Sequence, residues 1–213
     1  TINLARDPRW GRNEESYGED PYLTSEIGAK SVEGMQGEDA KYLKTIATLK
    51  HFAANNCEGE RQTGTSVMTE KTFREYYTRT FKDIVESSNP ASVMSSYNAL
   101  TISRNGEVFS DYIASSANKY LLTDLLRRTW GFSGYVVGDC GAWENLFGRQ
   151  SMRQKLFPDW NLDDITAPMA VSKAFNAGNN LDCGSRAQGS TFESVEQGWM
   201  SEETLDVAVY SLF

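Results

Sequence analysis

The chain has 213 residues, of which 39% are apolar and 12% aromatic, so it is long enough for a domain with a sizeable core. Its formal net charge of −8 argues against a nucleic-acid partner, because a protein that binds phosphates needs a basic face. No apolar stretch approaches the ~20 residues of a membrane span, so we expect no membrane partner either.

Residues 1–22 are a polar stretch that begins with Thr1, and we expect a loop there with no strand or helix to anchor it. The strands and helices predicted below fill only part of a barrel of roughly 250 residues. We therefore expect residues 1–213 to be a single partial domain from the interior of a longer polypeptide. The sequence contains no targeting segment, and it leaves a secreted or periplasmic location open.

The first predicted helix covers 25–35, with Thr24 as its N-cap and Gly37 near its end. The apolar run 45–52 predicts a strand. A second helix begins after Thr69, because its apolar residues fall at three- and four-residue steps and form one face.

Pro90 ends that helix, and the apolar run 91–98 predicts a buried strand. We expect a loop over 99–116, then a helix over 119–130 and a strand over 134–139. A long loop over 143–163 follows. The next predicted helix begins at Asp164 or Thr166, runs through Pro168 to Ala177 and ends at Gly178. A short strand then reaches Asp182, and a final helix runs from Ser201 to Phe213.

Polar residues follow each predicted strand. Lys50 and His51 end the first, and Tyr97, Asp139 and Asp182 follow at intervals of about 45 positions, as repeated β-loop-α units would produce. The carboxyl ends of the strands in a parallel barrel open onto one face, which carries the active site. We therefore predict an α/β fold, specifically a partial (β/α)8 TIM-type barrel, with these side chains close together.

Asp139 is the strongest catalytic candidate, because it follows three β-forming residues and lies between Gly138 and Gly141. A carboxylate held in this way can attack the anomeric carbon of a sugar. The alternative is a structural aspartate that caps the following helix.

Three other strand-end residues have both a functional and a structural interpretation. His51 is the only histidine, so the chain has no multi-histidine metal site, and it is either catalytic or a buried polar group. Lys50 needs a partner within an apolar strand. Tyr97 is either a core residue or a hydrogen-bond partner of Asp139.

The charged loop near Arg12 suits sugar or carboxylate recognition, because arginines lie on both sides of Trp10. Cys57, Cys140 and Cys183 lack the paired spacing of a zinc site, so we expect no metal. They fit one disulfide with a free thiol or three reduced thiols equally well.

Long stretches of the sequence resemble glycoside hydrolase family 3. The matching segments are RDPRWGRNEESYGEDPYL at 6–23, KHFAANN at 50–56 with Glu58 and Arg61 after it, MSSYNA at 94–99, YLLTDLLRRTWGFSGYVVGDCGA at 120–142 and AGNNLDCG at 177–184. They keep their order over almost the whole chain.

The resemblance implies an exo-acting, retaining β-glycosidase that needs no cofactor and contains a (β/α)8-type barrel followed by an α/β-sandwich domain. Carried over by position, Asp139 is the nucleophile. Arg12, Lys50, His51 and Tyr97 bind the terminal sugar or orient the nucleophile. The expected partners are an oligosaccharide or aryl glycoside and the remainder of the chain, whose second domain supplies the acid/base, so residues 1–213 alone should be inactive.

The residue after Asp139 bears on the sugar. Family members similar to β-glucosidases commonly have tryptophan there, and members similar to β-xylosidases have cysteine, so Cys140 favours a β-xylosidase and leaves a β-glucosidase as the alternative. The branch with a histidine acid/base in the loop after 50–56 is disfavoured, because this chain has no histidine there. Adjacent strand ends would also bring Cys140 and Cys183 within disulfide range and leave Cys57 free.

Two readings from other classes remain. A Schiff-base lyase or aldolase would use Lys50 at the strand end. A sugar-binding protein without catalytic activity would keep Asp139 and lack an acid/base within reach.

Overall fold

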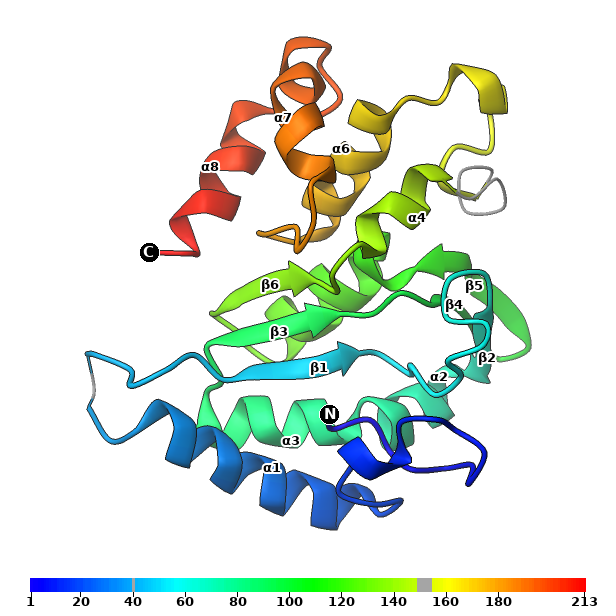
Figure 1. Ribbon diagram of the computed structural model, residues 1–213. Helices are drawn as coiled ribbons and strands as arrows, with labels where there is room; N and C mark the ends of the chain where they lie inside the picture. Colours follow the sequence, from blue (N-terminus) through cyan, green and yellow to red (C-terminus); the bar gives the residue numbers. More distant parts are fainter. Residues whose placement is uncertain (40, 149–154) are drawn as a thin grey trace.

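The computed structural model describes residues 1–39, 41–148 and 155–213. Its central sheet consists of β1 (Thr48–Phe52), β3 (Ser92–Ser95) and β6 (Tyr135–Gly138), which lie in that order and run parallel (Figure 1). Leu181 extends this order through a parallel bridge to Val137 in β6. The α/β fold and the three predicted strands are therefore confirmed, although β1 begins at Thr48 rather than at residue 45.

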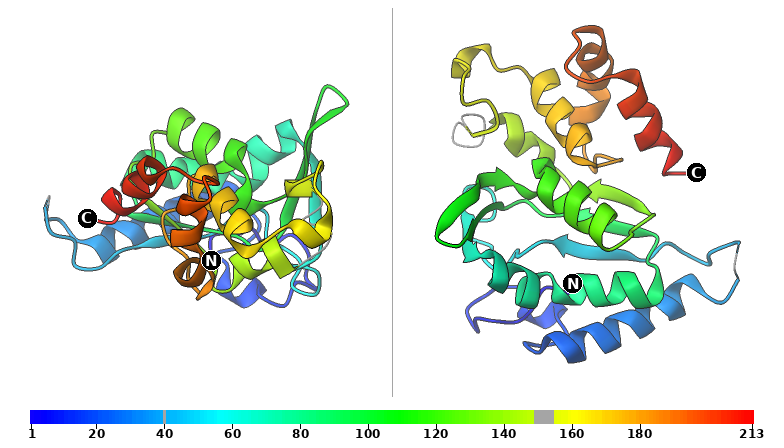
Figure 2. Two further views of the ribbon diagram at one scale, coloured as in Figure 1. Left: turned by 90° about the horizontal axis from the view of Figure 1, so that it is seen from above. Right: turned by 180° about the vertical axis from the view of Figure 1, so that it is seen from behind.

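Helices lie on both sides of this sheet. In Figure 1, α1 (Pro21–Gln36) and α3 (Arg79–Ser88) lie beside β1, and four helices lie beyond β6. These four are α4 (Ala142–Gly148), α6 (Ala167–Ala177), α7 (Arg186–Glu196) and α8 (Glu202–Tyr210). Seen from behind, α3 and the π-helical segment η4 (Tyr120–Thr129) cover one face of the sheet (Figure 2). No helix in the described ranges is both long and apolar enough to span a bilayer.

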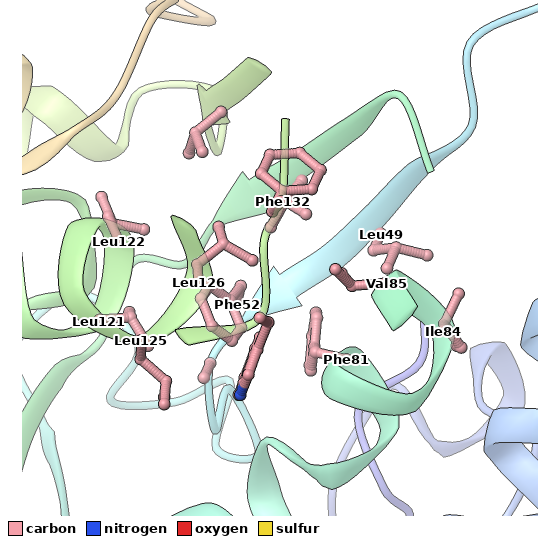
Figure 3. Close-up of a cluster of buried hydrophobic side chains, with 14 of the residues drawn as sticks. Leu49, Phe52, Phe81, Ile84, Val85, Leu121, Leu122, Leu125, Leu126 and Phe132 are labelled. Atoms are coloured by element: carbon pink, nitrogen blue, oxygen red, sulfur yellow. The ribbon is translucent and has the colours of Figure 1, made fainter. Parts of the chain in front are cut away.

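The main core lies between the sheet, α3 and η4. Figure 3 shows Leu49 and Phe52 of β1 facing Phe81 of α3, with the leucines of η4 on the other side. The ring centroids of Phe52 and Phe81 are 4.8 Å apart, and both side chains are fully buried. The three- and four-residue spacing of apolar residues in α3 and η4 therefore produces the expected packing face.

Several predicted helix ends are confirmed. Thr69 Oγ1 accepts a hydrogen bond from Thr72 N, and Ser201 Oγ accepts one from Thr204 N. Thr166 is the N-cap of α6, which ends at Gly178. The helix predicted after Thr69 is divided into α2 (Glu70–Thr72), a π turn η2 (Phe73–Tyr77) and α3.

The prediction of Thr24 as an N-cap was wrong. Asp20 has this role, because its Oδ1 accepts a hydrogen bond from Leu23 N at 2.7 Å and Pro21 occupies the first helical turn. Thr24 is fully buried inside the helix. The final helix also ends earlier than predicted, at Tyr210.

The loop predicted over 99–116 is a β-hairpin. Strands β4 (Ala99–Arg104) and β5 (Glu107–Ala114) are antiparallel and joined through Asn105 and Gly106, which both have positive φ. This Asn-Gly pair is a strong hairpin signal. Strand β2 (Thr65–Thr69) pairs with β4 in parallel and completes a second three-stranded sheet.

The N-terminal stretch is anchored, contrary to expectation. Ile2, Leu4 and Trp10 are buried, and Ile2 N donates a hydrogen bond to Lys50 O at 2.9 Å. This stretch therefore lies along β1 and helps to cover its edge. Of the predicted loop over 143–163, residues 149–154 lie outside the described ranges; the described part contains α4 and a short 3-10 turn, η5 (Leu162–Asp164).

Candidate functional site

Asp139 lies in a tight turn directly after β6. Its backbone N–H donates to Ser95 O at 2.9 Å, which continues the sheet by one residue. A Cβ on Gly138 would come within 2.4 Å of Trp143 Nε1, and Gly141 has a φ of +82°. Both flanking glycines are therefore required by the local geometry, and they fix where the Asp139 side chain leaves the strand.

The two carboxylate oxygens of Asp139 have different surroundings. Oδ1 accepts a hydrogen bond from Cys140 N at 2.8 Å, whereas Oδ2 is buried without a hydrogen-bond partner among the described residues. Burial raises the pKa of the Asp139 carboxyl, although the Cys140 N–H and the nearby Arg61, Arg12 and Lys50 act in the opposite direction. The negative charge on Oδ2 is thus compensated by no hydrogen bond within the described ranges.

The side chain of His51 lies beside this oxygen. Its Nε2 is 3.6 Å from Asp139 Oδ2, and its side chain is only 2% exposed. Burial lowers the pKa of His51 to about 3, and the positive charges of Arg12 and Lys50 add to the effect. His51 is therefore a neutral imidazole at physiological pH.

Arg12, Glu15 and Lys50 form a charged group at the edge of the site. Arg12 Nε and Nη2 each donate to a different carboxylate oxygen of Glu15 at 2.8 Å, and Lys50 Nζ lies 3.9 Å from Glu15 Oε2. The bond to Arg12 lowers the pKa of Glu15 to about 2. Arg12 Nη1 also reaches His51 Nε2 at 3.3 Å, so this group is joined to the buried histidine.

Tyr97 lies beside Asp139, but its hydroxyl donates to the backbone carbonyl of Cys140. The idea that Tyr97 bonds directly to the Asp139 carboxylate is therefore not supported by the described contacts. Burial, and then the charge of Asp139, raise the pKa of the Tyr97 hydroxyl. The Tyr97 ring lies 4.7 Å from the guanidinium carbon of Arg61.

Sequence reasoning assigned no role to Arg61, Glu58 or Asn3, which the fold brings to this site. Glu58 Oε2 is 3.2 Å from Arg61 Nη1, and its Oε1 accepts a hydrogen bond from Trp10 Nε1 at 3.4 Å. Asn3 contacts His51 directly. Arg61 and Glu58 could have been suspected, since they follow the segment of Lys50 and His51 in the same loop.

The disulfide between Cys140 and Cys183 is present, as predicted. Their Cα atoms are 4.3 Å apart, and Gly141 N donates to Cys183 O at 2.8 Å. Cys57 is exposed and free, also as predicted. The residue after Asp139 is therefore covalently tied to the loop that follows Leu181.

Asp182 follows Leu181, which is paired with β6, but its side chain is bonded to the backbone of the next helix. Its Oδ2 accepts a hydrogen bond from Ala187 N at 3.0 Å in the first turn of α7. Within the described ranges, no group of three or more histidine, cysteine, aspartate or glutamate side chains is arranged to hold a metal ion. The site of Asp139, His51, Arg12, Lys50 and Tyr97 thus has, among the described residues, one carboxylate oxygen without a hydrogen-bond partner, which lies beside His51.

Known proteins match both the sequence and the fold. The model of the glycosyl hydrolase family 3 N-terminal domain matches residues 1–211. A xylan 1,4-beta-xylosidase from Xylanibacter ruminicola is 36% identical over 99% of this chain and 22% of its own length. A thermostable beta-glucosidase B from Acetivibrio thermocellus is 42% identical over 66% of this chain and 17% of its own length.

Solved structures give the same result. The family 3 exo-beta-xylosidase XlnD, in complex with a xylobiose aziridine probe, has a TM-score of 0.81 and 33% identity over 99% of this chain and 26% of its own. Beta-glucosidase 3B from Thermotoga neapolitana, in complex with glucose, has a TM-score of 0.74 and 32% identity over 99% of this chain and 25% of its own. The chain spans about a quarter of the length of these relatives. From its sequence and its fold alike, the chain belongs to glycosyl hydrolase family 3, in the part that forms the family's N-terminal domain.

Proposed function

We propose that this chain is the nucleophile-bearing part of a retaining exo-β-glycosidase that acts on β-xylosides. The observation that carries the proposal is the carboxylate of Asp139. It follows β6 directly and is held by the Cys140 N–H, and one of its oxygens has no hydrogen-bond partner in the described part of the chain and lies 3.6 Å from a neutral histidine. A carboxylate in a water-poor site, held in place by backbone contacts, is well suited to nucleophilic attack.

The proposed reaction is a double displacement. Asp139 Oδ2 forms a bond to the anomeric carbon while the bond to the leaving-group oxygen breaks, and an acid elsewhere donates a proton to that oxygen. Water then attacks the glycosyl-enzyme with the same group acting as base, which restores the carboxylate. Retention requires the second carboxyl group to lie roughly 5–5.5 Å from the first.

We assign that second group to the remainder of a longer polypeptide. The known relatives are about four times as long as this chain, which supports a second domain that contributes to the site. In this proposal residues 1–213 provide the nucleophile and the sugar-binding groups and are inactive alone.

Arg12, Lys50, His51 and Tyr97 are proposed to hold the terminal sugar and the nucleophile. Arg12 and Lys50 present donors beside Asp139, and the neutral His51 presents a ring nitrogen as an acceptor. Tyr97 acts on the backbone of Cys140, and therefore on the turn that contains Asp139. Binding energy from the sugar hydroxyls then positions the anomeric carbon for attack.

We also propose that the central sheet is part of a (β/α)8-type barrel. β1, β3 and β6 pair in parallel in one sheet, Leu181 adds a parallel bridge to β6, and residues 1–4 lie beside β1 through the bond from Ile2 N to Lys50 O. Asp139 and His51 lie at the carboxyl ends of these strands, which is the active-site end of such barrels.

Xylose is favoured over glucose by two observations. Several of the similar relatives are xylosidases over the full chain, and Cys140 with its disulfide occupies the place beside Asp139 where the glucosidase-like pattern has tryptophan. A β-glucosidase is the second candidate, supported by the 42% identity to the enzyme from Acetivibrio thermocellus. A Schiff-base mechanism is less well supported, because Lys50 is 38% exposed and lies beside Glu15 rather than in an apolar pocket.

Covalent trapping tests the proposal. The longer protein is incubated with an activated 2-deoxy-2-fluoro-β-xyloside, and its peptides are mapped by mass spectrometry. The expected result is one label, on Asp139, together with a higher kcat/KM for aryl β-xyloside than for aryl β-glucoside. A label on another residue contradicts the nucleophile, and a preference for glucoside favours the second candidate. A protein that gains no label and hydrolyses neither substrate contradicts the proposal.

A further inference from the structure

Asn3 is a buried side chain that contacts His51 through both ends of its amide. Its Nδ2 donates to His51 O at 2.9 Å, and its Oδ1 accepts from His51 N at 2.8 Å. Thr1 Oγ1 lies 2.9 Å from Oδ1 and 2.6 Å from Lys50 O, and its single proton can be donated to only one of them. The two backbone contacts fix which end of the amide is oxygen, because a backbone N–H can only donate and a backbone carbonyl can only accept.

The same oxygen lies beside the histidine ring. Asn3 Oδ1 is 3.2 Å from His51 Nδ1. Because an amide oxygen only accepts, the proton of the neutral ring must be on Nδ1 for this contact to be a hydrogen bond.

The contact of Arg12 with the other ring nitrogen of His51 also indicates that the proton is on Nδ1. Its Nη1 lies 3.3 Å from His51 Nε2, and a guanidinium has no acceptor. Nε2 must therefore offer its lone pair. The charged groups around His51 are Arg12 and Glu15 from the N-terminal stretch, Lys50 from β1 and Asp139 after β6, and burial with Arg12 and Lys50 keeps the ring neutral.

This tautomer has a consequence for Asp139. Nε2 faces Asp139 Oδ2 at 3.6 Å, and without a proton it cannot donate to that oxygen. The other tautomer would place an N–H against the carboxylate, form a charge-assisted hydrogen bond and stabilise the resting anion. A carboxylate stabilised in this way is a weaker nucleophile.

We infer that Asn3 is a positioning residue, which holds His51 as the Nδ1–H tautomer and so keeps Oδ2 of Asp139 free of a hydrogen bond. The part that concerns His51 stands on the contacts alone. The part that concerns reactivity rests on the proposed function, in which Asp139 is the nucleophile.

The tautomer can be observed directly, since His51 is the only histidine in the 213-residue chain. The chain is labelled with ¹⁵N-histidine, and its imidazole nitrogens are assigned by long-range ¹H–¹⁵N correlation at neutral pH. We expect a protonated Nδ1 and a bare Nε2. A proton on Nε2, or one shared between the two nitrogens, overturns the inference.

Two variants and a control isolate the role of Asn3. Asn3→Leu should move the proton to Nε2, whereas Asn3→Asp keeps an acceptor and should retain Nδ1–H while raising the pH at which the ring takes up its second proton. Asn118→Leu removes a similarly buried asparagine that caps η4, so it should lower stability and leave the tautomer unchanged. A folded Asn3→Leu variant that keeps Nδ1–H overturns the role of Asn3. If Asn3→Leu does not fold, the Asn3→Asp variant gives the test: a His51 titration that is the same as in the wild type overturns the role of Asn3.

Kinetics of the longer protein test the consequence for Asp139. Asn3→Leu should lower kcat for aryl β-xyloside about tenfold, the equivalent of one hydrogen bond, with little change in KM. It should also shift the acid limb of the kcat/KM profile to lower pH, whereas a structural loss alone leaves that limb in place. A wild-type protein without glycosidase activity contradicts the proposed function and leaves the NMR result standing. An active wild type whose acid limb is unchanged in Asn3→Leu contradicts the effect on Asp139.

Discussion

Asp139 and His51 differ from the charged side chains at the edge of the site in what determines their protonation. Both inner residues are largely buried, and burial is the main cause of the pKa shift of each. At the edge, the pKa values of Arg12 and Glu15 are shifted mainly by their bond to each other. Desolvation disfavours the charged form, and pairing favours it.

In the proposed enzyme, this difference separates the contacts that matter for reaction from those that matter for recognition. The inner pair provides a carboxylate whose charge is poorly compensated and a neutral imidazole, and buried groups with shifted pKa values are typical of reactive sites. The outer group provides charges that are already compensated and can exchange partners with the hydroxyls of a sugar. Changes to the inner pair should therefore have larger effects than changes to the outer group.

The largest effect is expected from Asp139→Asn in the longer protein. The amide cannot form the covalent intermediate, so kcat/KM for aryl β-xyloside should fall on the order of 10⁴-fold while the protein remains folded. Asp124→Asn is the matched control, because Asp124 is 42% exposed and pairs with Arg128 on η4. Equal losses of kcat/KM in Asp139→Asn and Asp124→Asn would contradict the special role of the buried pair.

The second prediction concerns His51 and pH. Its folded-state pKa is about 3, against an ordinary value of 6.5, so the unfolded chain binds this proton first. The contribution of His51 to stability is complete above pH 6.5 and is lost as the pH falls towards 3, by about 5 kcal/mol at most. The raised pKa of Asp139 acts in the opposite direction and offsets part of the loss.

Urea unfolding at a series of pH values measures this loss. Between pH 6.5 and 5.5, above the range in which Glu15 and Glu70 gain protons in the unfolded chain, the free energy of unfolding should decrease for the wild type and change less for His51→Gln. Equal slopes for the two proteins would show that His51 is accessible to protons in the folded state.

A smaller effect is expected from Arg12→Lys. Lysine keeps the charge but cannot make the two parallel bonds to Glu15, so kcat/KM should fall roughly 10- to 100-fold, mainly through KM. Steady-state kinetics of the variant measure the split. A loss confined to kcat would place Arg12 with the inner pair instead.

The smallest effect is expected from Arg9→Ala, three positions earlier. Arg9 pairs with Asp7 as Arg12 pairs with Glu15, but its side chain is 88% exposed, whereas that of Arg12 is 17% exposed. Exposed pairs contribute little, so both the melting temperature and kcat/KM should stay at the wild-type values. A tenfold loss of activity would extend the site along the N-terminal stretch.

The central strands could be predicted from the sequence, because each is a short apolar run with polar residues at its end. Asp139 was found for the same reason. The second sheet was missed since two of its strands, β2 and β5, are largely exposed: Val67 is 73% and Val108 is 53% exposed, so no apolar run marks these strands. Helix α7 buries only Ser190 and Ser194 among its own residues and has no apolar stripe to detect.

The contacts of Asn3 and Arg61 could be recognised only from the folded structure. Asn3 reaches a histidine 48 positions away, and Arg61 lies over a tyrosine in the segment between β3 and β4. Neither position is distinctive in the sequence without its partner. Local patterns thus gave the positions of the strand-end residues, and only the structure gave the hydrogen bonds that decide how those residues titrate.

The disulfide has a consequence for how this domain can change over time. It closes a loop between Cys140 and Cys183, a separation of 43 residues, and the entropy of such a closure corresponds to about 4 kcal/mol. Each doubling of loop length costs only about 0.6 kcal/mol more. Because its two ends are clamped beside Asp139, the exposed parts of the intervening segment can be lengthened or exchanged while this carboxylate stays in place. In the proposed glycosidase, the segment is therefore a natural position for evolving or engineering leaving-group preference.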